Sequence, residues 1–283
     1  MKIKVAVIAS LMLTSLVTGC SSTFMADKPN NDSQALRIAK AAGIGGDLRD
    51  TEVPKDTVND ITMSPGYGFA LAASGYNAPL PGISSGSMAA MNFTAWLLAP
   101  KPAAKRNSMF AWMPASLAGD KPRDTLADMV LEAGAIAATE LGYQEASKHI
   151  GGKGKYRKSG VAIGFKNGED TNCRPHKKPV CAMSFGLRTP QKKNEGPEAL
   201  SLDDEGITWF FNPSKGVYSY FNFTENTGLD ELEMLVAASK HLPEWVYFYV
   251  APKKIKTKGD LKIRIPLIVN QGKVLYFIKE ETS

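Results

Sequence analysis

Seven short apolar runs follow residue 160, and this pattern restricts the fold more than any other feature of the chain. Each run is rich in β-branched or aromatic residues and is separated from the next by polar or glycine-containing segments, which is typical of β-strands. Turn residues at 212–216 and 270–272 predict two hairpins. We therefore expect an antiparallel sheet built from the runs at 161–165, 180–187, 207–211, 217–223, 245–250, 261–269 and 274–278.

Helical patterns lie mainly upstream of these runs. We expect a short helix capped by Ser33, and a longer helix with Asp120 as its cap and Pro122 in its first turn. Between them, the apolar residues 109–114 fit a buried strand. A third helix, capped by Thr227, interrupts the strands. The predicted fold class is α+β: an N-terminal helical part followed by a mainly antiparallel sheet with a packed helix.

A glycine-rich basic segment at residues 151–160 marks a change in composition. It separates a helix-rich part, residues 34–150, from a β-rich part, residues 161–283, although both parts are also compatible with one domain. The chain has 283 residues and is 43% hydrophobic, so it can bury a core without metals or many disulfides. The net charge of +6 is too small to indicate a nucleic-acid-binding protein, and we expect no nucleic-acid partner.

Residues 61–100 contain no Asp, Glu, Lys or Arg. Repeated prolines and glycines break this segment, so no apolar run is long enough to span a bilayer as a helix. Our main interpretation is that the helical patterns at 67–73 and 87–98 are core elements. The alternative is a surface that docks on a partner or enters the lipid interface, with Phe93, Trp96 and Leu97 as its apolar residues.

The first twenty residues have the pattern of an export signal. Lys2 and Lys4 precede an apolar stretch, residues 5–17, that is too short for a stable membrane span. The end of the stretch resembles the lipobox of bacterial lipoproteins, formed by Leu16, Val17, Thr18, Gly19 and Cys20. The alternative is an ordinary secretory signal with a chance cysteine.

The resemblance implies a diacylglyceryl group on the Cys20 sulfur, removal of the signal peptide at residues 1–19, and a fatty acid such as palmitate on the new amino group. Residues 20–33 then form a polar tether. Enteric-type lipoproteins with an aspartate after the cysteine stay at the inner membrane, and this chain has Ser21 there. By resemblance, we expect a lipid anchor in the outer membrane and a body facing the periplasm.

Cys173 and Cys181 are the two cysteines outside the lipobox. In an oxidising compartment we expect a disulfide between them that closes a hairpin loop. The alternative is a zinc site, which needs two further ligands and has only His176 nearby. We expect no metal and no cofactor.

Residues 82–86 match the G-x-S-x-G pattern of a serine hydrolase, with Ser84 as the nucleophile. In the order of that enzyme class, Asp203, Asp204 or Asp230 and then His241 are the partners. The strand that precedes such a motif is missing, because two prolines interrupt residues 77–81. A glycine-rich turn is therefore our main interpretation, and a hydrolase is the alternative. The acidic residues 203–205 are read as a solvated turn, with a calcium site as the alternative.

Basic residues recur in short clusters that can favour binding to anionic lipid, lipopolysaccharide or an acidic partner protein. The clusters are Lys101/Lys105/Arg106, Lys153/Lys155/Arg157/Lys158, Arg174/Lys177/Lys178, Lys192/Lys193 and Lys253/Lys254/Lys256/Lys258. The aromatic residues at 209–211 and 218–223 are expected in the sheet core, with a glycan-stacking platform as the alternative. Together these features favour a non-enzymatic structural or binding component of a secretion-like or conjugation-like envelope assembly. Its expected partner is another envelope protein or further copies of the same chain. A lipid-anchored serine hydrolase and a glycan or lipopolysaccharide binder are the alternatives.

Overall fold

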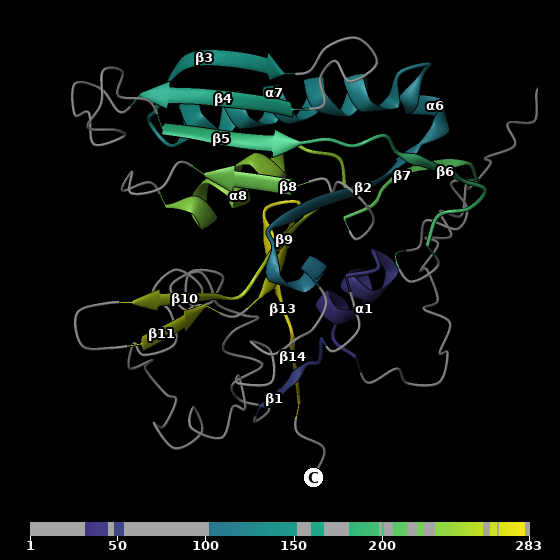
Figure 1. Cartoon of the computed structure of the whole chain (residues 1–283), viewed down its shortest axis with the longest axis vertical. Coiled ribbons are helices and arrows are strands. Elements are labelled where there is room, and N and C mark those ends of the chain that lie inside the picture. The colour runs from purple at the N-terminus through teal and green to yellow at the C-terminus, as the bar shows by residue number, and fades with distance from the viewer. Residues whose placement is uncertain are drawn as a thin grey trace, which may run out of the picture. The chain divides into compact units, whose positions relative to one another are not determined.

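The chain from Asp32 to Ser283 forms one compact unit in the computed structural model (Figure 1). The structure describes residues 32–44, 48–53, 102–151, 160–166, 181–197, 200, 206–213, 220–223, 230–256, 261–264 and 266–280. Within these residues, helices combine with mainly antiparallel sheets, which confirms the predicted α+β class.

A six-stranded antiparallel sheet is the largest element of this unit. Its strand order is β13-β12-β9-β2-β7-β6, so strands far apart in sequence lie side by side. The central strand β2 is buried along its whole length, as expected for a strand covered on both faces. The strands are β2 (Ser108–Pro114), β6 (Gln191–Lys193), β7 (Thr208–Phe211), β9 (Val246–Val250), β12 (Leu267–Asn270) and β13 (Lys273–Tyr276).

A second antiparallel sheet has the order β3-β4-β5-β8. It consists of β3 (Gln144–Gly151), β4 (Gly160–Lys166), β5 (Cys181–Gly186) and β8 (Tyr220–Phe223). Two smaller pairs complete the strands. β1 (Thr51–Val53) runs parallel to β14 (Ile278–Glu280), and β10 (Lys253–Lys256) pairs with β11 (Leu261–Arg264) in the antiparallel sense.

Helices cover both sheets and also contact one another. α7 (Pro122–Glu140) packs on β3 and β4, and α8 (Glu231–Lys240) packs on β9, β12 and β13. α7 and α8 are also in contact, so they join the two sheets. α1 (Gln34–Ala41) contacts β13, and the short α6 (Ala115–Ala118) contacts β2 and β7 (Figure 1). A 3₁₀ turn, η1 (Pro102–Lys105), precedes β2.

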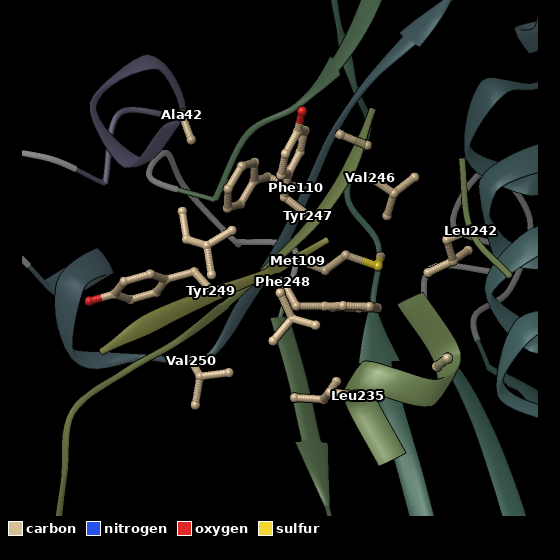
Figure 2. Close-up of a cluster of buried hydrophobic side chains, with 14 of the residues drawn as sticks. Ala42, Met109, Phe110, Leu235, Leu242, Val246, Tyr247, Phe248, Tyr249 and Val250 are labelled. Atoms are coloured by element: carbon tan, nitrogen blue, oxygen red, sulfur yellow. The ribbon is translucent and has the colours of Figure 1, made fainter. Parts of the chain in front are cut away.

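Among the described residues, one hydrophobic core includes side chains from both larger sheets and from α1, α7 and α8. In β2 and β9, Met109 lies opposite Phe248 and Phe110 lies opposite Tyr247, so the two pairs face opposite sides of the sheet. Figure 2 shows this cluster, to which Leu235 is contributed by α8. The second sheet joins the same core through β5, because the ring of Phe185 lies 5.9 Å from the ring of Phe248.

The helix starts confirm some predicted caps and correct others. The Ser33 hydroxyl accepts a hydrogen bond from the Leu36 N–H, as predicted for the N-terminal cap of α1. α8 is capped by Asp230, whose carboxylate accepts two backbone N–H groups, so the prediction of Thr227 as the cap is wrong. The prediction of Asp120 for α7 is also wrong: Lys121 is the N-cap, and no side chain bonds there. Pro122 removes one of the free N–H groups and so reduces the need for a cap.

Strand pairing confirms one predicted hairpin and contradicts the other. β12 and β13 form the hairpin predicted at 270–272, with Asn270 opposite Lys273. β7 and β8 do not pair with each other: β7 lies between β2 and β6, whereas β8 lies beside β5. The prediction of a hairpin turning at 212–216 is therefore wrong. β3 has no counterpart among the predicted strands, because its sequence QEASKHIG has little apolar alternation.

Candidate functional site

His241 lies at the C-terminal cap of α8 and contacts the last residue of α7. Its Nε2 atom is 2.8 Å from Oε1 of Glu140. Both side chains are partly exposed, at 27% for His241 and 42% for Glu140. A histidine held by a carboxylate is the arrangement that orients a general base, and it also links the ends of two packed helices.

Asp230 is excluded as the carboxylate partner of His241. It caps the N-terminus of α8, while His241 lies beyond the last residue of the same helix. Ten helical residues separate the two ends by about 15 Å, given the rise of 1.5 Å per residue. Glu140 was not among the expected partners, because the α7–α8 contact that brings it there leaves no local signal in the sequence. Ser84, Asp203 and Asp204 lie outside the described residues.

Several other predicted site residues lie outside the described part of the chain. These are the lipid-attachment residue Cys20, the disulfide residue Cys173, and Phe93, Trp96 and Leu97 of the candidate docking surface. Cys181 is the first residue of β5, where its position in the ladder is opposite Phe165 of β4. β4 and β5 are thus an antiparallel pair that flanks the sequence containing Cys173.

A cluster of charged and polar side chains lies at the start of the compact unit Asp32–Ser283, which we call the body. The backbone N–H of Ser33 donates to Oδ2 of Asp50, and the Ser33 hydroxyl donates to Oδ1 of the same carboxylate. Both distances are 2.5 Å. Lys40 forms an ion pair with Asp32 at 2.5 Å. Burial raises the pKa of Asp50, and the two bonds from Ser33 oppose this shift. Asp50 therefore holds the start of α1 against the chain that leads into β1.

The same end of the body includes the C-terminal strand. Glu52 of β1 and Lys279 of β14 lie opposite each other in the parallel ladder. Their side chains form an ion pair of 3.0 Å. The start of the body is therefore held by strand pairing to residues near the end of the chain.

Most aromatic side chains of the six-stranded sheet are in the core and are not available for stacking on a glycan. The rings of Trp112 and Phe210 stack at 5.0 Å, and those of Phe110 and Tyr247 at 5.5 Å. Phe210 and Phe211 are 6% and 1% exposed, which confirms the prediction of sheet core for these residues. Burial raises the pKa of Tyr247 to about 12.

One small surface beside α6 exposes apolar side chains. Leu117 of α6 is 52% exposed, and Ile207, which precedes β7, is 41% exposed. The Ala115 N–H donates to the Ile207 carbonyl at 2.9 Å, which fixes α6 against the start of β7. Trp209 is half-buried, and Lys192 of the exposed edge strand β6 lies opposite it. We call Leu117, Ile207, Trp209 and Lys192 the α6–β7 patch.

The α6–β7 patch was not found by sequence reasoning, which assigned the run at 207–211 to a strand and left 115–118 without a role. Only the composition of β6, with Lys192 and Lys193 in three residues, indicated an exposed surface there. Among the described residues, no helix is long and apolar enough to cross a membrane. The same residues contain no group of three or more His, Cys, Asp or Glu side chains placed to hold a metal ion.

Comparison with known proteins gives no relative from which a function can be transferred. No family model, no curated protein and no solved structure matches this chain. Any functional conclusion therefore rests on the residues and contacts of the chain itself.

Proposed function

We propose that the chain is a lipoprotein anchored in the outer membrane through Cys20, with its body in the periplasm as a structural or binding component of an envelope assembly. The observation that carries this proposal is the lipobox at residues 16–20, followed by a polar segment that leads into a compact unit at Asp32. Several acyl chains on one cysteine make anchoring effectively permanent, because each buried CH₂ contributes about 0.8 kcal/mol.

The anchor is tested by replacing Cys20. Cys20→Ala should abolish incorporation of a fatty-acid analogue and leave the signal peptide attached, because the modified sulfur is missing. Cys173→Ala is the matched control, since it removes a cysteine outside the lipobox and should leave labelling unchanged. Labelling that persists in Cys20→Ala would contradict the lipoprotein assignment.

The binding role is supported by the clusters of basic residues in the sequence and by the uncharged segment at residues 61–100. If this segment docks on another envelope protein, Trp96→Glu should reduce recovery of that partner from cross-linked native membranes while the unfolding midpoint is unchanged. If the segment belongs to the core, the same variant should lose several kcal/mol of stability, because an unpaired carboxylate is costly to bury. If the assembly is of the secretion or conjugation type, we expect the recovered partners to be other envelope proteins.

A serine hydrolase is the second candidate, and the contact between His241 and Glu140 favours it. A triad built on this contact would have Glu140 bound to Nε2 of His241 and Nδ1 as the base, which is the reverse of the usual arrangement, and Ser84 is the candidate nucleophile. An active Ser84 would react with a fluorophosphonate probe, and labelling would disappear in Ser84→Ala but not in the control Ser85→Ala. We expect no labelling of the mature protein. Labelling that depends on both Ser84 and His241 would make the hydrolase the better assignment.

A further inference from the structure

The strand pair β10–β11 continues a ladder that begins in the core. β9 pairs with β12 as far as Val250 and Leu267, and β10 pairs with β11 in the same register. Pro252 and Pro266 lie between the two parts of this ladder, and a proline cannot donate a backbone hydrogen bond there. β10 and β11 therefore form a two-stranded sheet of their own (Figure 1). We call these two strands the basic arm.

The basic arm concentrates the positive charge of the chain. Five of its eight residues are Lys or Arg and none is acidic, so it carries a charge of +5, whereas the whole chain carries +6. Each of its four opposed pairs contains at least one base, and Lys253 lies directly opposite Arg264. Opposed residues share a face of a ladder and successive residues alternate between faces. By this register, each face of the arm has at least two bases.

The basic arm is poorly suited to covering the core of the body. A strand pair that packs on a core needs one apolar face, whereas each face of the arm includes lysine positions. Burying an ammonium group without a partner is costly. Like charges at opposed positions, such as Lys253 and Arg264, also destabilise a sheet of only two strands. An anionic surface beside the arm would neutralise these charges and stabilise the pair.

The basic arm lies at the end of the sheet that also holds the start of the body. Tyr276 of β13 is opposite Leu267, the first residue of β12 after the arm. β14 begins two residues after Tyr276 and pairs with β1. Asp50, directly before β1, accepts two hydrogen bonds from Ser33. The arm and the start of the body, from which the chain leads back to Cys20, are therefore at the same end of the six-stranded sheet.

We propose that the basic arm contacts the lipid phosphates of the anionic bilayer in which Cys20 is anchored. This inference rests on the proposed lipid anchor, because the anchor brings the bilayer to this end of the body. The segment from Cys20 to Asp32 spans at most about 40 Å when extended. A body held within that distance has a high effective concentration of membrane surface. The contact then limits how the body can rotate on its tether.

An anionic bilayer is the occupant that this placement favours. The two ion pairs at the start of the body neutralise one acid each. The exposed Glu280 of β14 weakens the attraction to lipid, and the exposed Arg49, directly before Asp50, adds to it. The described acids at this end therefore leave most of the charge of the arm uncancelled. An acidic protein would also attract the arm, but the anchor places the bilayer, and not a particular protein, beside it.

The test uses the mature chain with Cys20→Ser, which cannot be lipidated, so that vesicle binding reports the arm without the anchor. The probe is vesicles of phosphatidylcholine with about 30 mol % phosphatidylglycerol at low ionic strength. We expect the parent protein to bind them. Lys256→Gln combined with Lys262→Gln removes one base from each face of the arm. Binding should weaken by about 25-fold, since each lysine near an anionic surface contributes about fivefold.

Two control variants separate the arm from net charge and from folding. Lys192→Gln combined with Lys193→Gln removes two exposed lysines of β6, so it has the net charge of the arm variant but an intact arm. It should lose much less binding than the arm variant. Lys256→Arg combined with Lys262→Arg keeps the charge of the arm and should bind as the parent protein does.

Several outcomes would overturn the inference. The parent protein fails to bind the anionic vesicles, or it binds pure phosphatidylcholine equally well. The arm variant and the β6 variant weaken binding equally, since net charge alone is then responsible. The arginine variant binds as weakly as the glutamine variant, since charge is then not responsible. The glutamine variant of the arm binds vesicles as the parent protein does but loses a cross-linked protein in native membranes, since the occupant is then an acidic protein.

Failure of the anchor is a separate result. Loss of fatty-acid labelling is measured at Cys20, whereas vesicle binding is measured with Cys20 already replaced. A labelled protein whose arm does not bind vesicles contradicts only the contact of the arm with lipid. An unlabelled protein whose arm binds vesicles contradicts only the lipoprotein proposal.

Discussion

The turn between β12 and β13 provides a sharp test of how the sheet is attached to α8. Both turn residues have positive φ angles, 49° at Gln271 and 72° at Gly272, as a two-residue hairpin requires. The Gly272 N–H donates to the Ser239 hydroxyl of α8 at 2.8 Å, and the Gln271 side chain donates to the Leu242 carbonyl. The turn therefore satisfies groups at the end of the helix while it reverses the chain.

Gly272→Ala should raise the free energy of the folded state in two ways. A side chain at this positive φ costs about 1–2 kcal/mol, partly offset by about 0.4–1 kcal/mol from the reduced freedom of the unfolded chain. The new Cβ would also lie 2.7 Å from Cγ of Lys240, so the Lys240 side chain must change its rotamer. We expect that shift to cost about 1 kcal/mol more. The free energy of unfolding should thus fall by about 2 kcal/mol in total.

Gly142→Ala is the matched control for this prediction. Gly142 has a φ of 80°, but a Cβ placed there meets no atom within 4 Å. It should therefore lose only the backbone contribution, about 1 kcal/mol. Urea unfolding of both variants measures the difference, and Lys240→Ala in the Gly272→Ala background should remove most of it. The reasoning is refuted if Gly272→Ala is no less stable than Gly142→Ala, or if Lys240→Ala leaves the difference unchanged.

Three further predictions concern the core, the start of the body and the cysteine loop. Phe185→Ala should lower the free energy of unfolding by about 3–5 kcal/mol, since Phe185 is 1% exposed, and circular dichroism and tryptophan fluorescence should still report one transition. Two separate transitions would contradict the shared core. The raised pKa of Asp50 means that the folded state holds its proton more tightly than the unfolded state. Relative to Asp50→Asn, the wild-type protein should lose stability as the pH rises from about 4 through the folded-state pKa, and a constant difference in urea unfolding would argue against this. Mass spectrometry without reduction should find Cys173 and Cys181 in one cross-linked peptide, whereas two freely alkylated thiols would exclude the disulfide.

The elements that could be predicted from the sequence are those that depend on local signals. The cap at Ser33, the buried strand at 109–114 and the turn at 270–272 each depend on residues that are adjacent in the chain. Ser33 needs only its own hydroxyl and the N–H of Leu36, and the β12–β13 hairpin needs only two residues that tolerate positive φ. These features are therefore present in the structure where the sequence indicates them.

Features that depend on long-range contacts could not be predicted in this way. The segments 207–211 and 217–223 have the pattern of a hairpin, yet β7 pairs with β2 and β6, and β8 pairs with β5. The choice between these partners is made by the core, in which the buried ring of Phe210 stacks on Trp112. The partner of His241 was missed for the same reason, because Glu140 reaches it only through the packing of α7 on α8.

The pairing of β1 with β14 also bears on the export that we propose for this chain. Thr51 lies opposite Ile278, so the start of the body is completed only by residues near the end of the chain. Contacts at such large sequence separation slow folding, because the entropy of closing the loop is lost before the contact forms. A chain that crosses a membrane unfolded, as the proposed signal implies, benefits from this delay. The ion pair between Glu52 and Lys279 closes the same long loop, because its two residues lie opposite each other in this strand pair.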